Sequence, residues 1–493
     1  MTSQLILTVI TFLPLAGAAV ILFLGSGQLP RWIALGTTLA TLAAMGPLCS
    51  GFDKTQGGLQ FDDFVLHWFS IGNIHLNYQL GVDGISLPFI VLSGLLTLLC
   101  VGASWTAVQD RTREFYAALL VAETAMIGLF AAANFFVFFI FWELMVVPLF
   151  LLIGIWGGPN RVFAAVKFLL FTLAGSVLML VGMIALGVAA APDATLNFEQ
   201  LANSSLGLTT QNWLFLAFLA AFAVKVPMFP VHTWLPDAHT EAPTAGSVIL
   251  AGILLKMGAY GFLRIALPVL PGAVQTFLVP MLVISVVAII YGAYVTLAQT
   301  DIKRLIAYSS ISHMGFVTLG IFTLDQAGVE GAVLQMINHG IVSAALFLCV
   351  GMIYERTHTR EIKDYGGVGK IAPVYAALLA LFCLAAAGFP GLNSFVGEFL
   401  IIGGAFKTNV GLGLLAIWGV VLGTIYVIWL YYRMVMGETN PGLQDLKLEL
   451  NRREILTLAP LALLVLYLGL HPECVLSYLH APVKQLLSSG VMP

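Results

Sequence analysis

Four ionisable side chains lie deep inside long apolar stretches of this sequence: Glu143, Lys225, Lys256 and Glu398. A charge at the centre of a membrane costs at least a few kcal/mol, so each of these residues needs a chemical reason to be there. Burial and a neighbouring charge can together bring the pKa of a lysine or a glutamate close to neutral pH. These residue types therefore favour a pathway along which a proton passes from one side chain to the next.

Further ionisable residues within apolar segments extend this set. His313 and His339 can exchange protons near neutral pH, and the alternative for each is a neutral histidine that packs and donates one N–H. Glu123 either belongs to the pathway or hydrogen-bonds a neighbouring helix. Lys167 lies about one turn inside its helix, so it can also extend its ammonium group to the membrane surface.

The composition indicates that membrane-spanning helices hold these side chains. Of the 493 residues, 60% are hydrophobic and 9% are charged, and the mean hydropathy is +0.98. Soluble domains carry about 25% charged residues. The 21 basic and 24 acidic residues nearly cancel, so no field attracts nucleic acid. The expected fold class is an all-α polytopic membrane protein in a lipid bilayer.

About 20 apolar residues are needed to cross the hydrocarbon core, and the sequence contains fourteen such stretches. The first has no preceding basic region and no small-residue cleavage site, which predicts a retained helix and not a signal peptide. The predicted spans are 5–24, 32–49, 85–107, 115–133, 135–156, 162–189, 212–234, 246–268, 274–298, 303–322, 329–354, 372–402, 411–436 and 454–470.

Two of these spans are interrupted. The seventh contains Pro227 and Pro230, and the twelfth contains the sequence GFPG at 388–391. A broken helix leaves backbone groups that only a polar, partly hydrated cavity can satisfy. Lys225 lies two residues before the first break and Glu398 shortly after the second, so each discontinuous span carries a buried charge.

The positions of the two breaks predict an internal repeat. Spans four to eight and nine to thirteen would form two units with the broken helix at the corresponding place in each. Because five is odd, the units would have opposite topology, which is the inverted repeat of transporters. We therefore expect helices 1–3 with an outer loop in 1–110, the two repeats in 111–270 and 271–436, and an inner linker, helix 14 and an outer tail in 437–493.

Lysine and arginine residues are distributed unevenly between the loops. Fourteen lie in one alternate set of loops, and the other set with the C-terminal tail holds only Lys54, Arg264, Lys407 and Lys484. The positive-inside rule places the richer set in the cytoplasm and both termini on the outer side. In the outer loop, the alternation of QFDDFVLHWF (60–69) predicts a short surface hairpin.

The chemistry of the buried row favours protons over sodium ions. Lysine and histidine exchange protons and repel cations, whereas sodium needs a cluster of oxygen ligands, which only unwound backbone carbonyls could supply here. The five cysteines stand singly, with no spacing typical of a metal or iron–sulfur site, and no GxGxxG motif follows a strand. We expect neither a cofactor nor a metal in this chain.

Several long motifs resemble the antiporter-like subunits of respiratory complex I. They are FWELMVVP (141–148), AVKVPMFPVHTWLPDAHTEAPTAGSVILAGILLKMGAYG (223–261), QTDIKRLIAYSSISHMG (299–315), NHGIVSAALF (338–347) and GFPGLNSFVGEF (388–399). The resemblance covers about residues 80–436. The chain is most similar to the subunit M family of bacterial NADH-quinone oxidoreductases. Glu398 stands where most sister subunits have lysine, and the tail after the last span is too short for the long lateral helix of the distal subunit.

The resemblance implies a role for each matched residue. Glu143 would pair with Lys225 near the inner intake, and Glu398 would lie at the outward exit. Between them, protons would be relayed along the axis by Lys256, His313 and His339. For other residues that match the motif, loop folding is the favoured role over proton transfer: His232, Asp237, His239 and Glu241.

The same resemblance implies a proton-translocating subunit of an NADH:quinone oxidoreductase in the bacterial inner membrane. NADH, FMN, iron–sulfur clusters and quinone would be bound by partner subunits, and sister antiporter-like subunits would be neighbours. A subunit of a multisubunit sodium/proton antiporter or of a membrane-bound hydrogenase is the alternative, because both share these motifs. A scaffold with vestigial charges is disfavoured by the intact set of buried charges.

Overall fold

Long apolar stretches form most of the helices in the computed structural model, which describes residues 5–62, 64–71, 74–190 and 196–488. Helices of this kind satisfy their backbone hydrogen bonds internally, as a bilayer requires. The long helices are α1 (Ile6–Leu24), α2 (Leu29–Ser50), α3 (Leu87–Ala107), α4 (Thr112–Ala131), α7 (Arg161–Ala189), α14 (Pro271–Leu297), α15 (Ile302–Phe322), α16 (Gln326–Thr357), α20 (Val410–Val435) and α21 (Arg452–Leu470).

Two further spans are continuous but irregular. One consists of α5 (Phe135–Leu144) followed directly by α6 (Val146–Trp156). In the other, two π-helical segments interrupt the α-helix, and its parts are α11 (Thr244–Ile249), η2 (Leu250–Leu254), α12 (Leu255–Gly261), η3 (Phe262–Ala266) and α13 (Leu267–Val269). A π segment adds a residue to a turn and often marks a functional position in a helix.

Both predicted helix breaks are present. The seventh span consists of α9 (Leu208–Lys225) and α10 (Trp234–Glu241), and the twelfth of α18 (Pro373–Ala386) and α19 (Asn393–Thr408). Each of the fourteen predicted spans therefore corresponds to one helix or to a series of consecutive helical segments. Thirteen segments of the described chain are long and apolar enough to cross a membrane on their own. The pair α18–α19 falls short of that length because its break lies near the middle.

Side-chain caps explain where several helices begin. The Asn134 side chain accepts a hydrogen bond from the Val137 amide at the start of α5. Asp301 caps α15 in the same way, and Asp325 caps α16. Such caps satisfy amides that have no partner within the helix, so they fix the ends of spans whose apolar pattern alone leaves the boundary open.

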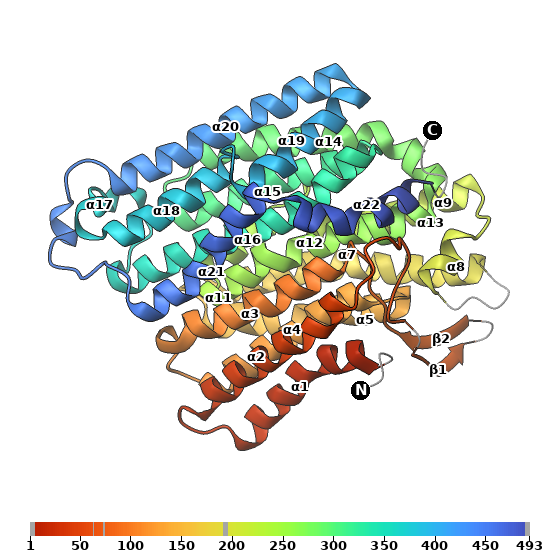
Figure 1. Cartoon of the computed structure of the whole chain (residues 1–493), viewed down its shortest axis with the longest axis horizontal. Helices are drawn as coiled ribbons and strands as arrows, with labels where there is room; N and C mark the ends of the chain where they lie inside the picture. Colours follow the sequence, from red (N-terminus) through yellow and green to blue (C-terminus); the bar gives the residue numbers. More distant parts are fainter. Residues whose placement is uncertain (1–4, 63, 72–73, 191–195, 489–493) are drawn as a thin grey trace.

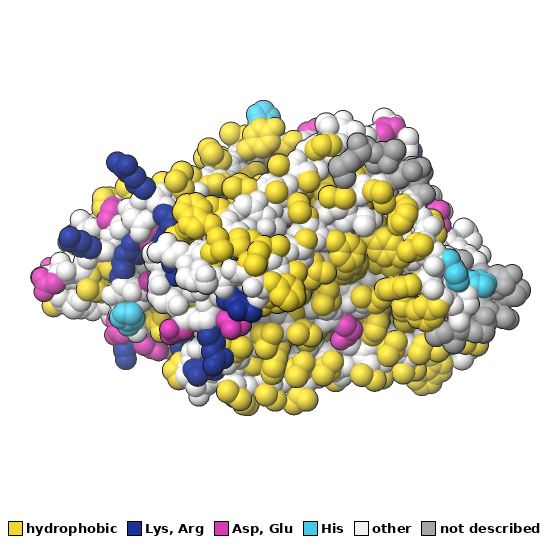
Figure 2. Space-filling model, turned by 90° about the horizontal axis from the view of Figure 1, so that it is seen from below, with side chains coloured by type: hydrophobic (Ala, Val, Ile, Leu, Met, Phe, Trp, Pro, Cys, Tyr) yellow, Lys and Arg dark blue, Asp and Glu magenta, His cyan; other side chains and the backbone are white. Residues whose placement is uncertain are grey.

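The two ends of the bundle differ in structure and charge. One end carries the antiparallel strands β1 (Val65–Ile71) and β2 (Ile74–Gln79) and the short helix α8 (Phe198–Ala202); we call it the hairpin end (Figure 1). Lysine and arginine side chains gather at the opposite end, which we call the basic end (Figure 2). It carries the short helices η4 (Ile362–Asp364), α17 (Val368–Ile371) and η5 (Pro441–Leu443).

The predicted hairpin is confirmed, although its strands extend beyond the stretch 60–69, of which residue 63 lies outside the described residues. The sequence did not predict α22 (Glu473–Ser488), which packs against α16 and α13. Its apolar side chains lie on one face, too few for a membrane span.

Burial distinguishes the centre of the bundle from its rim. In its apolar window α16 is 100% buried, whereas α2 is 28% buried. The spans α4, α15 and α11–α13 also lie in the interior, and α1, α7, α14 and α20 expose apolar side chains over much of their surface. The ionisable residues of the interior helices are therefore shielded from lipid by other helices.

Candidate functional site

A chain of contacts joins four of the six principal candidates in the middle of the bundle. Lys256 Nζ lies 2.6 Å from His339 Nδ1, and the His339 and His313 rings are 5.7 Å apart between centroids. His313 Nδ1 lies 3.2 Å from Glu398 Oε1. All four side chains are buried. Because ammonium, imidazole and carboxyl groups can each bind and release a proton, this row can move a proton in short steps.

The break in the twelfth span shapes the surroundings of Glu398. Gly388 adopts a φ of +68°, and a Cβ atom there would lie 2.8 Å from Glu398 Oε2. Only glycine fits this turn, because it tolerates the left-handed backbone and leaves room for the carboxylate. The Gln335 side chain donates a hydrogen bond to Glu398 Oε1 at 3.0 Å. The break thus places the end of the row against a turn of the backbone.

The seventh span holds Lys225 differently. Lys225 is the last residue of α9, it is 1% exposed, and its ammonium nitrogen has no hydrogen-bond partner. Its Nζ lies 4.8 Å from the centre of the Trp142 ring, a cation–π contact, and the Trp142 indole is held by a hydrogen bond to Ser176.

Glu143 lies next to Trp142, close to the junction of α5 and α6. The structure does not bring Glu143 and Lys225 into hydrogen-bond contact, although the sequence predicts that they pair. Oε1 of Glu143 is buried without a partner.

Lys167 lies apart from the row. Its Nζ forms an ion pair with Asp237 Oδ2 at 2.7 Å, and Arg304 lies 3.8 Å from the other oxygen of that carboxylate. About a quarter of each side chain in the Lys167–Asp237 pair is exposed. This geometry agrees with the alternative in which Lys167 extends toward the basic end.

The remaining candidates are buried without forming the row. Both ring nitrogens of His239 lack hydrogen-bond partners, and its ring stacks on Phe347 at 4.6 Å. Glu123 is fully buried, and neither carboxylate oxygen has a partner, so the predicted bond to a neighbouring helix is not formed. Glu241 accepts a hydrogen bond from the Asn160 amide, as a loop-folding residue would, and Nδ1 of His232 is unpaired.

Sequence reasoning missed three residues of the site: Trp142, Gln335 and Tyr426. The Tyr426 hydroxyl lies 3.2 Å from His313 Nε2, so both ring nitrogens of that histidine have partners. Gln335 and Tyr426 could have been identified from the sequence, because each has a polar atom in the middle of an apolar span. Trp142 carried no such signal, since tryptophan is common in apolar helices.

Within the described residues, no group of three or more His, Cys, Asp or Glu side chains could hold a metal ion. The five cysteines are free thiols, and each lies on a different helix.

Comparison with known proteins agrees with the geometry. The family model described as "NADH:quinone oxidoreductase/Mrp antiporter, TM" matches residues 132–425, which is more than half of the chain. The chain is 45% identical to the NADH-quinone oxidoreductase subunit M of Rhodobacter capsulatus, with 99% of this chain and 97% of that protein covered.

Solved structures show the same architecture. A chain of respiratory complex I from Thermus thermophilus superposes with a TM-score of 0.88 and 29% identity, over 98% of this chain and 99% of that one. A chain of the Mrp complex from Dietzia shares the fold, with a TM-score of 0.84 and 20% identity over the full length of both chains. The similarity to subunit M predicted from the motifs is confirmed.

Proposed function

Since the chain belongs to the NADH:quinone oxidoreductase/Mrp antiporter family, in its subunit M branch, we propose that it translocates protons for complex I along the row from Lys256 to Glu398. The observation that carries the assignment of residues is the unbroken series of contacts from Lys256 through His339 and His313 to Glu398. Redox chemistry in partner subunits, which bind NADH, FMN, iron–sulfur clusters and quinone, drives the cycle.

The two halves of the pathway have different tasks. Lys225 takes up a proton from the cytoplasmic side and passes it to Lys256, and the charge of Glu143 tunes its affinity. The histidines carry the proton along the axis. Glu398 releases it on the far side when the break beside Gly388 opens to water.

A proton-pumping assay tests this function. Lys256→Met keeps the length and the apolar part of the side chain but cannot bind a proton. We expect the assembled complex in liposomes to lose proton pumping by about 100-fold, the scale of general acid–base catalysis. Lys407→Met is the matched control, since Lys407 is 63% exposed at the hairpin end and pairs with Asp325. Wild-type pumping by the Lys256 variant would refute the proposal.

The same assay separates protons from sodium ions. Pumping that needs no sodium and survives a sodium ionophore supports proton translocation. Pumping that stops when sodium is removed would favour the antiporter alternative.

The gathering of lysine and arginine side chains at the basic end supports an orientation in a bacterial inner membrane with this end in the cytoplasm and the chain termini on the outer side. A cysteine at the exposed Lys363 should react with a membrane-impermeant reagent only from the cytoplasmic side. A cysteine at the exposed Asn203, at the hairpin end, should react only from outside. The reverse labelling pattern would mean that the basic end faces outward and that the direction of the proposed proton pathway is the opposite.

A further inference from the structure

The hairpin formed by β1 and β2 carries two histidines on one face, His67 and His75. Side chains alternate along a strand, so residues 67 and 70 of a regular strand would lie on opposite faces. In β1, however, the register shifts between His67 and Phe69, which is a β-bulge. On one side of the bulge His67 is paired with Asn77, and on the other side Ser70 is paired with His75. The bulge therefore places His67 on the same face as Ser70.

The Ser70 hydroxyl lies between the two imidazole rings. Its oxygen is 3.3 Å from Nε2 of His67 and 2.8 Å from Nδ1 of His75. The centroids of the two rings are 6.0 Å apart. His67 is exposed and His75 is half-buried, and histidine side chains are visible on the surface of this end of the molecule (Figure 2). One nitrogen of each ring is thus directed at the same point, which solvent can reach.

The Asn77 side chain fixes the orientation of the His67 ring. Nδ1 of His67 lies 3.1 Å from Oδ1 of Asn77, an oxygen that accepts hydrogen bonds and does not donate them. Nδ1 therefore carries the proton, and Nε2 offers its lone pair on the side of Ser70. Histidines that bind metal ions commonly donate their second ring N–H to an acceptor in this way. His75 offers the lone pair of Nδ1 when its own proton is on Nε2.

We propose that this face of the hairpin binds one divalent transition-metal ion such as Zn²⁺, with His67 Nε2 and His75 Nδ1 as ligands. Imidazole nitrogen suits zinc, copper and nickel, whereas magnesium and calcium prefer oxygen ligands. With Zn–N bonds of about 2.0 Å, two imidazole rings on a tetrahedral zinc have centroids roughly 5 Å apart. The observed 6.0 Å is close to this value, and the exposed His67 ring can move by the difference. The Ser70 oxygen and water complete the coordination.

A bound ion ties β1 to β2 and stabilises the hairpin, because it binds the paired strands better than separated ones. The site is independent of the row from Lys256 to Glu398. The sequence did not predict it, since only the bulged pairing of the strands brings the two histidines to one point.

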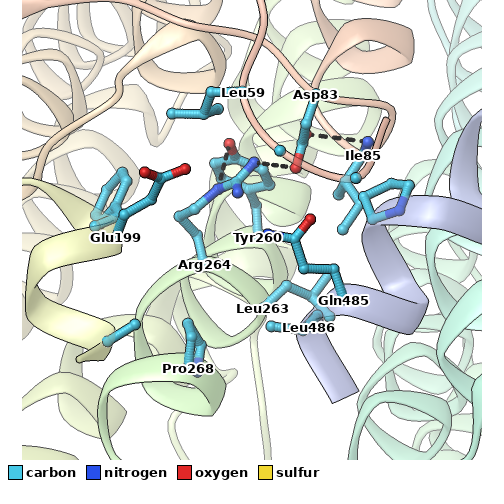
Figure 3. Close-up of a pocket in the computed structure, with 15 residues that line it drawn as sticks. Leu59, Asp83, Ile85, Glu199, Tyr260, Leu263, Arg264, Pro268, Gln485 and Leu486 are labelled. Atoms are coloured by element: carbon cyan, nitrogen blue, oxygen red, sulfur yellow. Dashed lines mark hydrogen bonds and ion pairs between the residues drawn. The ribbon is translucent and has the colours of Figure 1, made fainter. Parts of the chain in front are cut away.

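The polar cavity at the same end of the molecule suits a cation less well (Figure 3). Its volume is about 130 Å³, and Asp83 contributes a carboxylate to its lining. Arg264 Nη2 lies 2.7 Å from Asp83 Oδ2, and Figure 3 shows this pair among the residues that line the cavity. The guanidinium group neutralises the carboxylate and repels a second cation. The hairpin site, in contrast, is built from imidazoles that bind metal in their neutral form.

Zinc binding by the complete complex tests the site. The purified complex is dialysed against buffered Zn²⁺, and the bound zinc is measured. Wild type should hold one ion more per complex than the double variant His67→Gln/His75→Gln. His471→Gln, which changes an exposed histidine after α21, is the matched control and should bind like wild type. Asn77→Leu should weaken binding about tenfold, as the loss of a partner that orients a metal ligand does.

Cu²⁺ gives a second readout of the same site. In the oxidised complex, the copper spectrum measured by electron paramagnetic resonance should show nitrogen splitting from two imidazoles in wild type and from one in His67→Gln. Lowering the pH to about 5 should release the ion, because a protonated imidazole cannot bind metal.

Equal zinc binding by wild type and the double variant overturns the proposal and leaves Ser70 as a hydrogen bond between the strands. If the double variant does not assemble, His67→Gln alone is compared with wild type, and wild-type zinc binding in it refutes the site. If that variant also fails to assemble, a wild-type copper spectrum without splitting from two imidazoles refutes it.

Discussion

The two broken spans place a charged residue beside the interruption in different ways. In the seventh span, the Lys225 ammonium group has no hydrogen-bond partner among the described residues and faces the Trp142 ring. In the twelfth, Glu398 accepts one hydrogen bond from Gln335 and is in contact with His313. A helix break therefore lies beside both sites, but only one of them is joined to Lys256 by contacts. We call the Lys225 site the unconnected site and the Glu398 site the connected site.

Under the proposed function, this difference would assign proton uptake to Lys225 and proton delivery to Glu398. A buried ammonium group without a partner is costly, so Lys225 gains by moving toward Glu143 or toward water. A carboxylate with two partners is held in one position, and its proton is exchanged with the neighbouring imidazole. The unconnected site suits an element that changes position during the cycle, and the connected site suits a fixed relay.

The largest effect is expected from Glu398→Gln, which would remove the ionisable group at the end of the connected site. Glutamine cannot exchange the proton, so pumping should fall by about 100-fold. Assembly should persist because Gly388 and the break are unchanged. Glu398→Lys should retain part of the activity. Proton pumping and quinone reduction are measured together, and a wild-type ratio of protons to electrons in Glu398→Gln would show that the carboxyl group carries no proton.

Glu143→Gln tests the unconnected site and should lower pumping nearly as much, because the charge that acts on Lys225 disappears. The shorter Glu143→Asp should retain most of the activity, since no contact between Glu143 and Lys225 depends on the length of the side chain. Pumping in liposomes measures both variants. If the Asp variant is as inactive as the Gln variant, Glu143 and Lys225 come into close contact during the cycle. The Lys225 site would then resemble the Glu398 site more than the structure indicates.

Tyr426→Phe removes one hydrogen bond to His313 and leaves the ring packing intact. A net loss of about 1 kcal/mol corresponds to a roughly fivefold lower pumping rate. Tyr432→Phe, exposed on the same helix, serves as the control. An unchanged pumping rate would mean that Tyr426 only fills space beside the relay.

The smallest effect concerns two pairs of side chains at the hairpin end. Arg264 is paired with Asp83, and His480 of α22 lies 3.0 Å from Glu330 of α16. The hydrogen bond to Glu330 raises the pKa of His480, and Glu473 adds to this effect. Because the folded pKa is raised, the contact stabilises α22 fully below the unfolded pKa of about 6.5 and is lost as pH rises through the folded pKa.

His480→Gln should therefore lower the thermal unfolding midpoint more at pH 6 than at pH 9. About half of the His480 side chain is exposed, so the difference should correspond to at most about 1 kcal/mol. Thermal unfolding of the purified complex at both pH values measures it. An equal shift at the two values would show that the charge of His480 contributes nothing to the docking of α22.

Composition and hydropathy were sufficient to predict the spans. Unpaired backbone groups are costly in lipid, so a long apolar stretch can cross the membrane only as a helix, which pairs its own backbone groups. The two breaks were predictable for the same reason, since Pro227, Pro230 and the GFPG sequence cannot continue a helix. α22 was missed because a 16-residue helix with apolar side chains on one face has no long apolar run. Its apolar face becomes meaningful only against α16.

The sequence by itself determined which residues could carry protons. An ionisable side chain within an apolar helix is costly, so the few that are present stand out as candidates. Only the tertiary structure decided which of them meet. Lys256, His313, His339 and Glu398 come from four different spans, and their contacts depend on how α12, α15, α16 and α19 pack. The same packing leaves Glu143 and Lys225 apart and brings in Gln335 and Tyr426. Distances of a few ångströms between helices are set by packing across the whole bundle, which local sequence does not encode.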